Sequence, residues 1–151
     1  MILIATDGSA PARAAEAIGL ELARARKVAA TFVCVWAPLR GSFGMPLPEA
    51  LDSEFVDAER TWAEETLEAA AKRAEAGGMQ ADTVIVKGLA TDGICRTAQD
   101  RRAGMVVIGS HGWGAMMSLI FGSTTLGVLQ HAPCPVVVVR DHPGDTGEAT
   151  S

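Results

Sequence analysis

The residues best suited to chemistry lie in one glycine-rich stretch, "GSHGWGAMMSLIFGSTT", residues 109–125 of 151. Gly109, Gly112 and Gly122 stand in it, and Ser123 directly follows the last of them. Glycine permits a positive φ and lets another group approach the backbone amides closely. A glycine loop that leads into a helix presents unpaired N–H groups and the positive end of the helix dipole, which suits phosphate. The stretch predicts a phosphate site, against the alternative that its glycines only end a strand and turn a loop.

The elements that must position this stretch alternate between apolar runs and helical patterns. Five short apolar runs predict strands: "ILIAT", "VAATFVCVW", "DTVIVKG", "GMVVIGS" and "PVVVVR". Helical patterns occupy the intervals at 7–27, 51–76, 91–103 and 123–132. Because the strands are continuously apolar, both of their faces should be covered. The pattern therefore predicts an open, doubly wound α/β sheet with helices on both faces.

Local signals mark the ends and faces of these helices. Ser9 is the expected N-cap of the first helix, with Pro11 in its first turn, and Thr91 is the expected cap of the third. Gly77 and Gly78 predict the end of the second helix. The predicted apolar faces consist of Ala14, Ile18, Leu22 and Ala25 in the first helix, and Val56, Ala63, Leu67, Ala70 and Ala74 in the second.

Two polar loops should meet at one edge of the sheet. Ligands of open α/β sheets bind beyond the carboxyl ends of the strands, where the strand order reverses. "TDGS" at 6–9 follows the first strand, and the glycine-rich stretch follows the fourth. Asp7 would repel phosphate unless it faces a ribose hydroxyl, an adenine amino group or a metal ion, and its alternative role is an Asx turn. His111 could reach a phosphate, but no positioned partner for catalysis accompanies it.

Several longer matches identify a resemblance. The glycine stretch is not a P-loop, because no lysine follows its last glycine, and it lacks the third glycine of the dinucleotide fingerprint. "ATDGS", "VIGSHG", "GST" and "HAPCPVVVVR" instead resemble the universal stress protein family over residues 1–140. The spacing G-x2-G-x9-G-S resembles the branch of that family that binds ATP. Trp113 departs from the family, in which a basic residue often follows the second glycine.

The resemblance implies a fold, a ligand and an assembly. It implies one domain at 1–140, like the adenine nucleotide alpha hydrolases, with five parallel strands in the order 3-2-1-4-5. We expect the polar segment 141–151 to be a disordered tail. ATP with Mg²⁺ on its phosphates is the implied ligand, and a homodimer through the edge strand Pro135 to Arg140 is the implied assembly. The implied contact residues are Ala5, Thr6, Asp7, Val35, Ile108, Gly109, Gly112, Gly122, Ser123 and Thr124.

Bulk properties exclude several classes of function. A net charge of −5 and no basic run longer than "RARK" argue against nucleic-acid binding. No apolar run approaches the roughly 20 residues of a membrane span, and the first residues carry no leader pattern, so we expect a soluble, cytoplasmic protein. Cys34, Cys95 and Cys134 are far apart in sequence, which argues against a disulfide framework or a zinc site.

Three hypotheses for function follow. The first is a stress-response regulatory protein whose bound ATP alters a surface that an unknown protein partner reads. The second is a slow ATPase or phosphotransferase, for which only Asp7 and His111 are candidates and efficient turnover is not expected. The third is a dimeric interaction protein of the same fold with no nucleotide. The complete glycine set favours the first, on the argument that it has no structural need to persist without a ligand.

Overall fold

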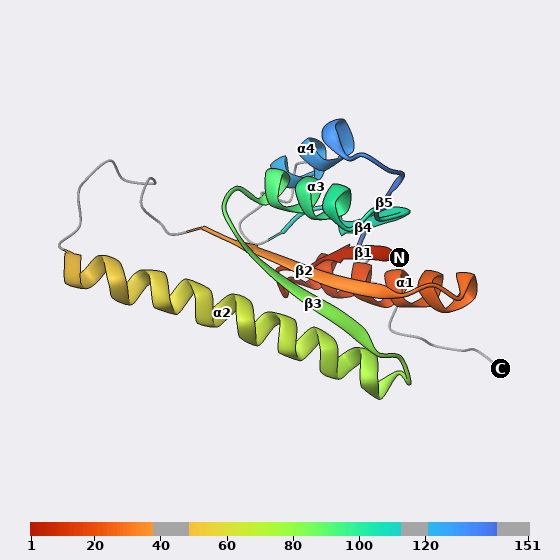
Figure 1. The fold of residues 1–151 in the computed structure, drawn as a ribbon, viewed down its shortest axis with the longest axis horizontal. Helices are drawn as coiled ribbons and strands as arrows, with labels where there is room; N and C mark the ends of the chain where they lie inside the picture. The colour runs from red at the N-terminus through yellow and green to blue at the C-terminus, as the bar shows by residue number, and fades with distance from the viewer. Residues whose placement is uncertain (38–48, 113–120, 142–151) are drawn as a thin grey trace.

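The computed structural model describes residues 1–37, 49–112 and 121–141, and of residues 49–52 only the backbone. The segment 38–48, Trp113 and the tail beyond Asp141 lie outside the described residues. The elements in order are β1 (Ile2–Ala5), α1 (Ala10–Arg26), β2 (Ala30–Trp36), α2 (Glu49–Ala76), β3 (Ala81–Lys87), α3 (Ala90–Asp100), β4 (Met105–Gly109), α4 (Ser123–His131) and β5 (Val136–Val139) (Figure 1). Within these ranges no helix is long and apolar enough to cross a membrane.

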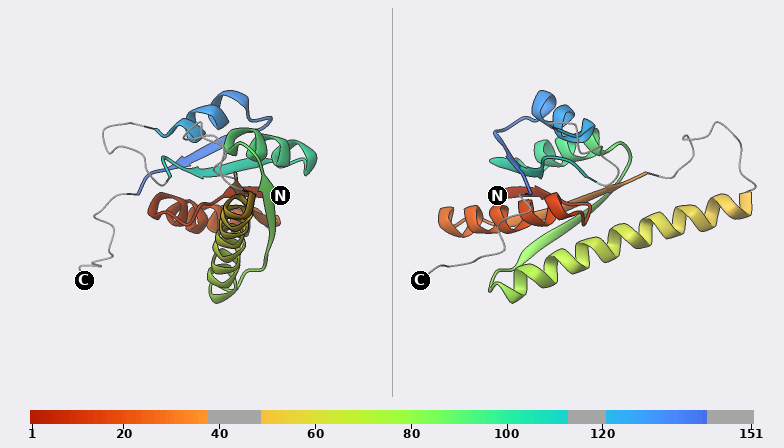
Figure 2. Two further views of the ribbon diagram at one scale, coloured as in Figure 1. Left: turned by 90° about the vertical axis from the view of Figure 1, so that its left-hand side faces the viewer. Right: turned by 180° about the vertical axis from the view of Figure 1, so that it is seen from behind.

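The five strands form one parallel sheet in the order β3-β2-β1-β4-β5, which confirms the predicted order. Ile4 in the central strand pairs with Phe32 of β2 on one side and with Val107 of β4 on the other. The helices α1 and α2 cover one face of the sheet, and α3 and α4 cover the other (Figures 1 and 2). The order reverses between β1 and β4, so the loops after these two strands lie side by side.

Strand alternation divides the core into two layers. Ile2 and Ile4 of β1 point toward α1 and α2, while Leu3 and Ala5 point toward α3 and α4. The strands β1, β2 and β4 are buried on both faces, as their apolar runs predict. The edge strands differ, because β3 contains only half-buried and exposed residues and β5 is half-buried throughout. Both faces of β5 still pack on the core, Val137 and Val139 on one layer and Val136 and Val138 on the other, so the predicted cover is present but partial at the edges.

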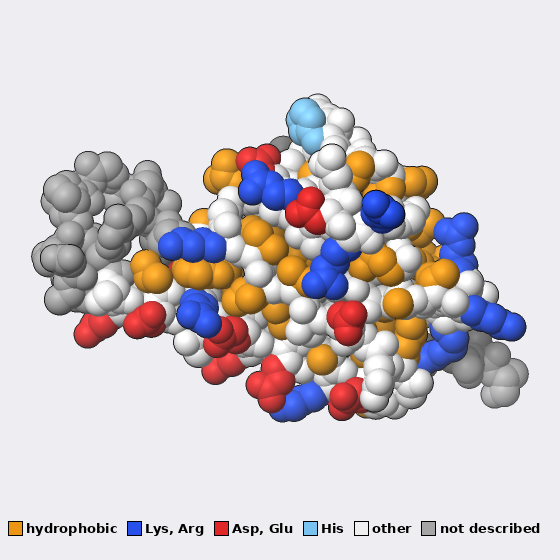
Figure 3. Space-filling view, in the orientation of Figure 1, with side chains coloured by type: hydrophobic (Ala, Val, Ile, Leu, Met, Phe, Trp, Pro, Cys, Tyr) orange, Lys and Arg blue, Asp and Glu red, His pale blue; other side chains and the backbone are white. Residues whose placement is uncertain are grey.

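The β3 side of the molecule has a mixed surface. Figure 3 shows basic and acidic side chains interspersed over this side, with hydrophobic side chains between them. Ile85 of β3 is 38% exposed, and Leu89, which precedes α3, is 71% exposed. Interspersed charge of this kind does not form the single-sign field that a nucleic-acid backbone requires.

The helix caps were predicted in part. Ser9 is the N-cap of α1, and its side chain accepts a hydrogen bond from the amide of Ala12, as predicted. Gly77 and Gly78 follow the last residue of α2, as predicted, and Gly78 adopts φ 76°. The prediction that Thr91 caps α3 was wrong, because Leu89 holds the N-cap position and provides no side-chain bond.

The buried face of α1 is not the predicted one. Ile18 is 38% exposed, whereas the sheet-facing residues are small, apart from one carboxylate: Pro11, Ala12, Ala15, Glu16, Gly19 and Ala23. Close packing on the sheet explains the difference, since a Cβ at Gly19 would lie 2.6 Å from the Ile4 side chain. A helix this near to a strand favours small residues over large apolar ones. In α2 the predicted face is confirmed at Ala63, Leu67, Ala70 and Ala74, which are buried, and Val56 is half-buried.

Replacing Gly19 by leucine should destabilise the fold. Because the new side chain would overlap Ile4, we expect Gly19→Leu to lower the free energy of unfolding by about 1–3 kcal/mol, despite leucine's better helix propensity. Ala17→Leu is the matched control, since Ala17 lies on the exposed side of the same helix. Urea titration of both variants measures the effect. Equal stability of the two variants would contradict the proposed packing of α1 on β1.

Candidate functional site

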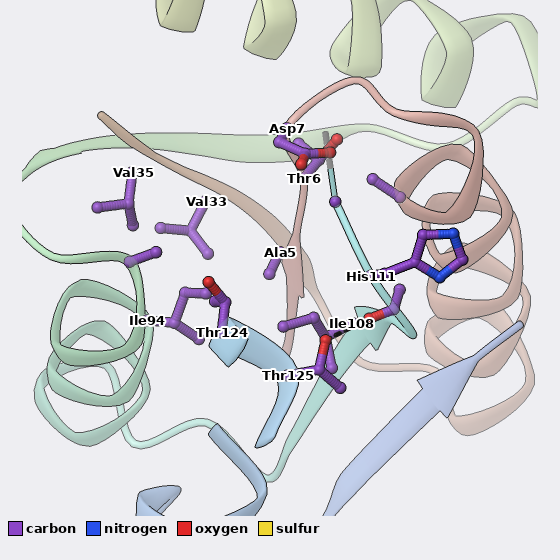
Figure 4. A pocket seen from close by; sticks show the side chains of 14 residues that line it. Ala5, Thr6, Asp7, Val33, Val35, Ile94, Ile108, His111, Thr124 and Thr125 are labelled. Atoms are coloured by element: carbon purple, nitrogen blue, oxygen red, sulfur yellow. Dashed lines mark hydrogen bonds between the residues drawn. The ribbon is translucent and has the colours of Figure 1, made fainter. Parts of the chain in front are cut away.

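A pocket of about 100 Å³ lies at the carboxyl ends of β1, β2 and β4. Its strand residues belong to the face covered by α3 and α4, because Ala5, Val33 and Ile108 all pack into that core layer. The pocket is thus at the reversal of strand order, where a ligand site is expected. The residues that line it are Ala5, Thr6, Asp7, Ala12, Val33, Val35, Ala90, Ile94, Ile108, Gly109, His111, Gly112, Thr124 and Thr125 (Figure 4).

Most of the residues predicted as a site are together in this lining. Of the predicted residues, Gly122 and Ser123 do not line the pocket. Those that do line it are Ala5, Thr6, Asp7, Val35, Ile108, Gly109, Gly112 and Thr124. The sequence could have indicated Val33, because it lies two residues before Val35 and alternate strand residues share a face. Ala90 and Ile94 of α3 carried no signal, because only the packing of α3 over β2 brings them to the pocket.

The pocket has an apolar side and a polar side. Val33, Val35 and Ile94 gather on one side, and His111 is opposite them (Figure 4). Asp7 lies at the end of β1, where its loop meets the pocket. An apolar wall combined with a few convergent polar groups is typical of small-molecule sites.

The three glycines of the motif each have a protein atom close by. A Cβ at Gly109 would lie 2.8 Å from the carbonyl carbon of Pro11, and one at Gly112 would meet the Asp7 carboxylate. A Cβ at Gly122 would lie 3.2 Å from the Cα of His111. The glycines with a positive φ in the described chain are others, among them Gly8. At Gly109, the expectation that the glycine set has no structural need was therefore wrong, because the backbone of Pro11 leaves no room for a side chain.

Two bonds fasten the β4 loop to the start of α4. The amide of Gly122 donates to the carbonyl of Ser110 at 2.8 Å, and the Thr125 hydroxyl donates to the carbonyl of Gly109, also at 2.8 Å. Thr125 is buried, and its hydroxyl holds the loop against the start of the helix. The first bond within α4 runs from Leu126 to Gly122, which leaves the first-turn amides of the helix directed out of its start. Thr124 brings this helix start into the pocket lining.

Asp7 takes part in the turn after β1. Its Oδ1 accepts a hydrogen bond from the amide of Ser9 at 3.0 Å, which is the Asx turn of the alternative interpretation. Gly8 adopts φ 77° between them. Burial, together with the charge of Asp7, raises the pKa of the Cys34 thiol on β2 to about 12. The negative charge of Asp7 therefore also acts on the buried thiol of Cys34, which remains protonated near neutral pH.

His111 has a neighbouring hydroxyl as its partner. Its Nδ1 lies 2.9 Å from the Oγ of Ser110, which is itself buried. Among the described residues, no group of three or more His, Cys, Asp or Glu side chains could hold a metal ion. The described pocket thus offers backbone amides, hydroxyls, one imidazole and one carboxylate, a donor set suited to a polar organic ligand with an anionic part.

A methyl group at Gly109 should destabilise the protein. Because the methyl group would meet the backbone of Pro11, which cannot rotate away, we expect Gly109→Ala to lower the free energy of unfolding by about 1–3 kcal/mol. Gly104→Ala is the control, since a Cβ there would lie 3.8 Å from its nearest neighbour, the Met1 carbonyl. Thermal unfolding of both variants measures the difference. A Gly109→Ala variant as stable as the control would show that the contact with Pro11 does not require glycine at this position.

Comparison with known proteins adds independent findings. The family model described as "Universal stress protein family" matches residues 1–140. A universal stress protein of Thermus aquaticus is 33% identical over 140 residues, which cover 92% of this chain and 97% of that protein.

Solved structures agree with the fold. The universal stress protein UspA from Lactobacillus plantarum superposes with a TM-score of 0.81 at 26% identity, covering 92% of this chain and 96% of that one. A universal stress protein solved in complex with cAMP superposes with a TM-score of 0.68 at 22% identity, covering 91% and 94%, and shows the shared fold alone. The family model and the sequence identity to a relative agree with the observed fold, and the chain belongs to the universal stress protein family.

Proposed function

We propose that this chain is a stress-response regulatory protein that binds an adenine nucleotide, ATP with Mg²⁺, in the pocket beyond β1, β2 and β4. The observation that carries the proposal is that an apolar wall and a helix start line the same pocket, at the reversal of strand order. The universal stress protein solved with cAMP supports an adenine ligand for this fold. It supplies no residue assignment for this chain.

The residues present fit the parts of such a ligand. Val33, Val35 and Ile94 offer an apolar surface for the adenine ring. Asp7 accepts hydrogen bonds and would serve the ribose hydroxyls or the adenine amino group, not the phosphates. The loop from Gly109 to Gly112 and the first turn of α4 would hold the phosphates through amides and the Thr124 hydroxyl. Mg²⁺ would supply charge neutralisation on the phosphate oxygens.

The proposal is for binding and not for rapid turnover. Hydrolysis requires a base that orients water and groups that stabilise the transferred phosphoryl. Asp7 is bonded to the amide of Ser9, and His111 is bonded to Ser110. Both side chains therefore already have structural partners. We propose that a bound nucleotide changes the surface around the pocket and that a protein partner recognises this change.

One observation favours a second candidate, a protein of this fold that acts through interactions and holds no nucleotide. Gly109 is required by contact with the chain itself, because a Cβ there would meet the backbone of Pro11. The motif alone therefore does not discriminate between the two candidates. The side chain of Thr124, which lines the pocket without belonging to the glycine set, provides a better test.

We also propose a homodimer through β5. Val136 to Val139 form an edge strand with one neighbour, β4, and all four are half-buried. Backbone amides on the β4 side donate to the carbonyls of Pro135 and Val139, so these two residues direct their backbone groups toward β4. Because successive residues of a strand face opposite sides, Val136 and Val138 direct their backbone groups to the open edge. Pairing two such edges about a two-fold axis would satisfy these groups and bury the valines.

Removal of the Thr124 hydroxyl tests the nucleotide site. If that hydroxyl donates to a phosphate, Thr124→Val should weaken ATP binding about tenfold or more, since a bond to a charged group contributes about 1.5–3 kcal/mol. Ser123→Ala is the matched control, because Ser123 is exposed and outside the pocket lining, and it should stay within about twofold of the original chain. Titration calorimetry with ATP and Mg²⁺ measures both variants.

The unmodified chain decides between the two candidates. Nucleotide released on denaturation of natively purified protein, identified by chromatography and mass, together with saturable heat on ATP addition, supports the nucleotide site. Absence of both would overturn it in favour of the interaction protein. Equal loss in Thr124→Val and Ser123→Ala would place the phosphates elsewhere along α4.

A proline at position 138 tests the dimer. Since the amide of Val138 faces the open edge, Val138→Pro should remove an intermolecular donor while leaving the β4 ladder intact, and the dimer should dissociate. Val138→Ala keeps that amide and should remain dimeric. Light scattering after size-exclusion chromatography measures the mass, and circular dichroism verifies the fold. A folded Val138→Pro dimer would show that another surface forms the interface.

A further inference from the structure

A buried carboxylate lies behind the pocket, on the sheet-facing side of α1. The Glu16 side chain is 3% exposed, on a helix face otherwise made of small residues such as Ala15 and Gly19. Removing a charge from water is costly unless the group is paired and hydrogen-bonded. A glutamate at this position therefore needs specific partners.

Its partners come from two distant parts of the chain. Arg73 of α2 donates from Nε to Oε2 at 2.8 Å and from a terminal nitrogen to Oε1 at 3.0 Å, a bidentate contact. The hydroxyl of Thr6, at the end of β1, donates to Oε1 at 2.5 Å. The carboxylate thus connects α2 to the first residue of the turn that lines the pocket.

The bond from Thr6 to Glu16 determines the other role of that hydroxyl. Because its proton is directed at Glu16, its oxygen is available to accept, and the amide of Gly8 donates to it at 3.2 Å. Gly8 is the residue at φ 77°, so this bond holds the unusual conformation of the turn. The same turn carries Asp7, whose carboxylate lies against Gly112 of the β4 loop. Displacement of the turn would displace Asp7 and the part of the β4 loop that it contacts.

We propose that Glu16, held by Arg73, is a positioning residue for the pocket. It orients the Thr6 hydroxyl and thereby sets the turn from Thr6 to Ser9 on which Asp7 and Gly112 depend. This inference rests on the proposed nucleotide site. It makes α2 a support of that site, although none of its described residues lines the pocket. A role in stability alone would predict that replacement of Glu16 lowers the free energy of unfolding without changing the affinity of the folded protein for ATP.

Two substitutions at position 16 separate these roles. Glu16→Gln keeps a carbonyl oxygen that can accept from Thr6, whereas Glu16→Leu removes the acceptor and fills the same space. The Arg73 side chain is 42% exposed in the unmodified protein, so we expect its charge to stay solvated in both variants. We expect Glu16→Leu, in which the buried Thr6 hydroxyl loses its acceptor, to bind ATP about tenfold more weakly, while Glu16→Gln stays within about threefold. Circular dichroism at the titration temperature verifies that both variants are folded. Unchanged affinity in Glu16→Leu, or equal loss in both variants, would overturn the proposal.

A double substitution tests whether the effect passes through Thr6. If Glu16 acts by orienting that hydroxyl, Thr6→Val and Glu16→Leu should each weaken binding, and the double variant should be no weaker than either alone. Additive losses would show that Glu16 acts by another route.

Amide exchange makes the inference testable without nucleotide. In the protein with no added ligand, the Gly8 amide should exchange faster in Glu16→Leu than in Glu16→Gln, because its acceptor loses its orientation. Equal exchange rates would overturn the positioning role. If the unmodified chain fails to bind ATP but the exchange difference is present, the nucleotide site fails and the positioning of the turn stands.

Discussion

The close approach of the loop after β4 to the start of α1 is the constraint on which the site depends. Gly109 lies against the backbone of Pro11, and Gly112 lies against the carboxylate of Asp7. Parallel pairing of β1 with β4 makes this approach necessary, because it places the two loops at the same edge of the sheet. Glycine is needed where the chain meets itself, and the pocket is the space that remains beside these contacts.

This constraint changes how the motif is interpreted. The spacing G-x2-G-x9-G-S indicates first that two loops pack tightly, and only through that packing that a ligand could bind. Gly122 illustrates the point, because its amide is bonded to Ser110 and it does not line the pocket. The groups that remain for an anion are the start of α4 and the loop from Gly109 to Gly112. A structural requirement and a binding site can therefore share the same glycines.

The support behind the pocket follows the same logic. Small residues on α1 let the helix lie close to β1, and this closeness brings Glu16 within reach of Thr6. The ion pair with Arg73 then joins the long helix α2 to the turn. Packing on one face of the sheet thus bears on a pocket that opens on the other face, through a single carboxylate.

The sequence by itself determined the strands, their parallel order through the family resemblance, the Ser9 cap and the meeting of two loops at one edge. These features depend on local patterns of apolar residues, prolines and glycines, which a chain carries wherever it folds. It did not determine the buried face of α1, the role of Thr125, or the lining contributed by Ala90 and Ile94. Only the tertiary structure decided these. On α1, for example, the short distance between helix and strand selects small residues over large apolar ones. The partner of a buried polar group, such as Arg73 for Glu16, can likewise lie 57 residues away.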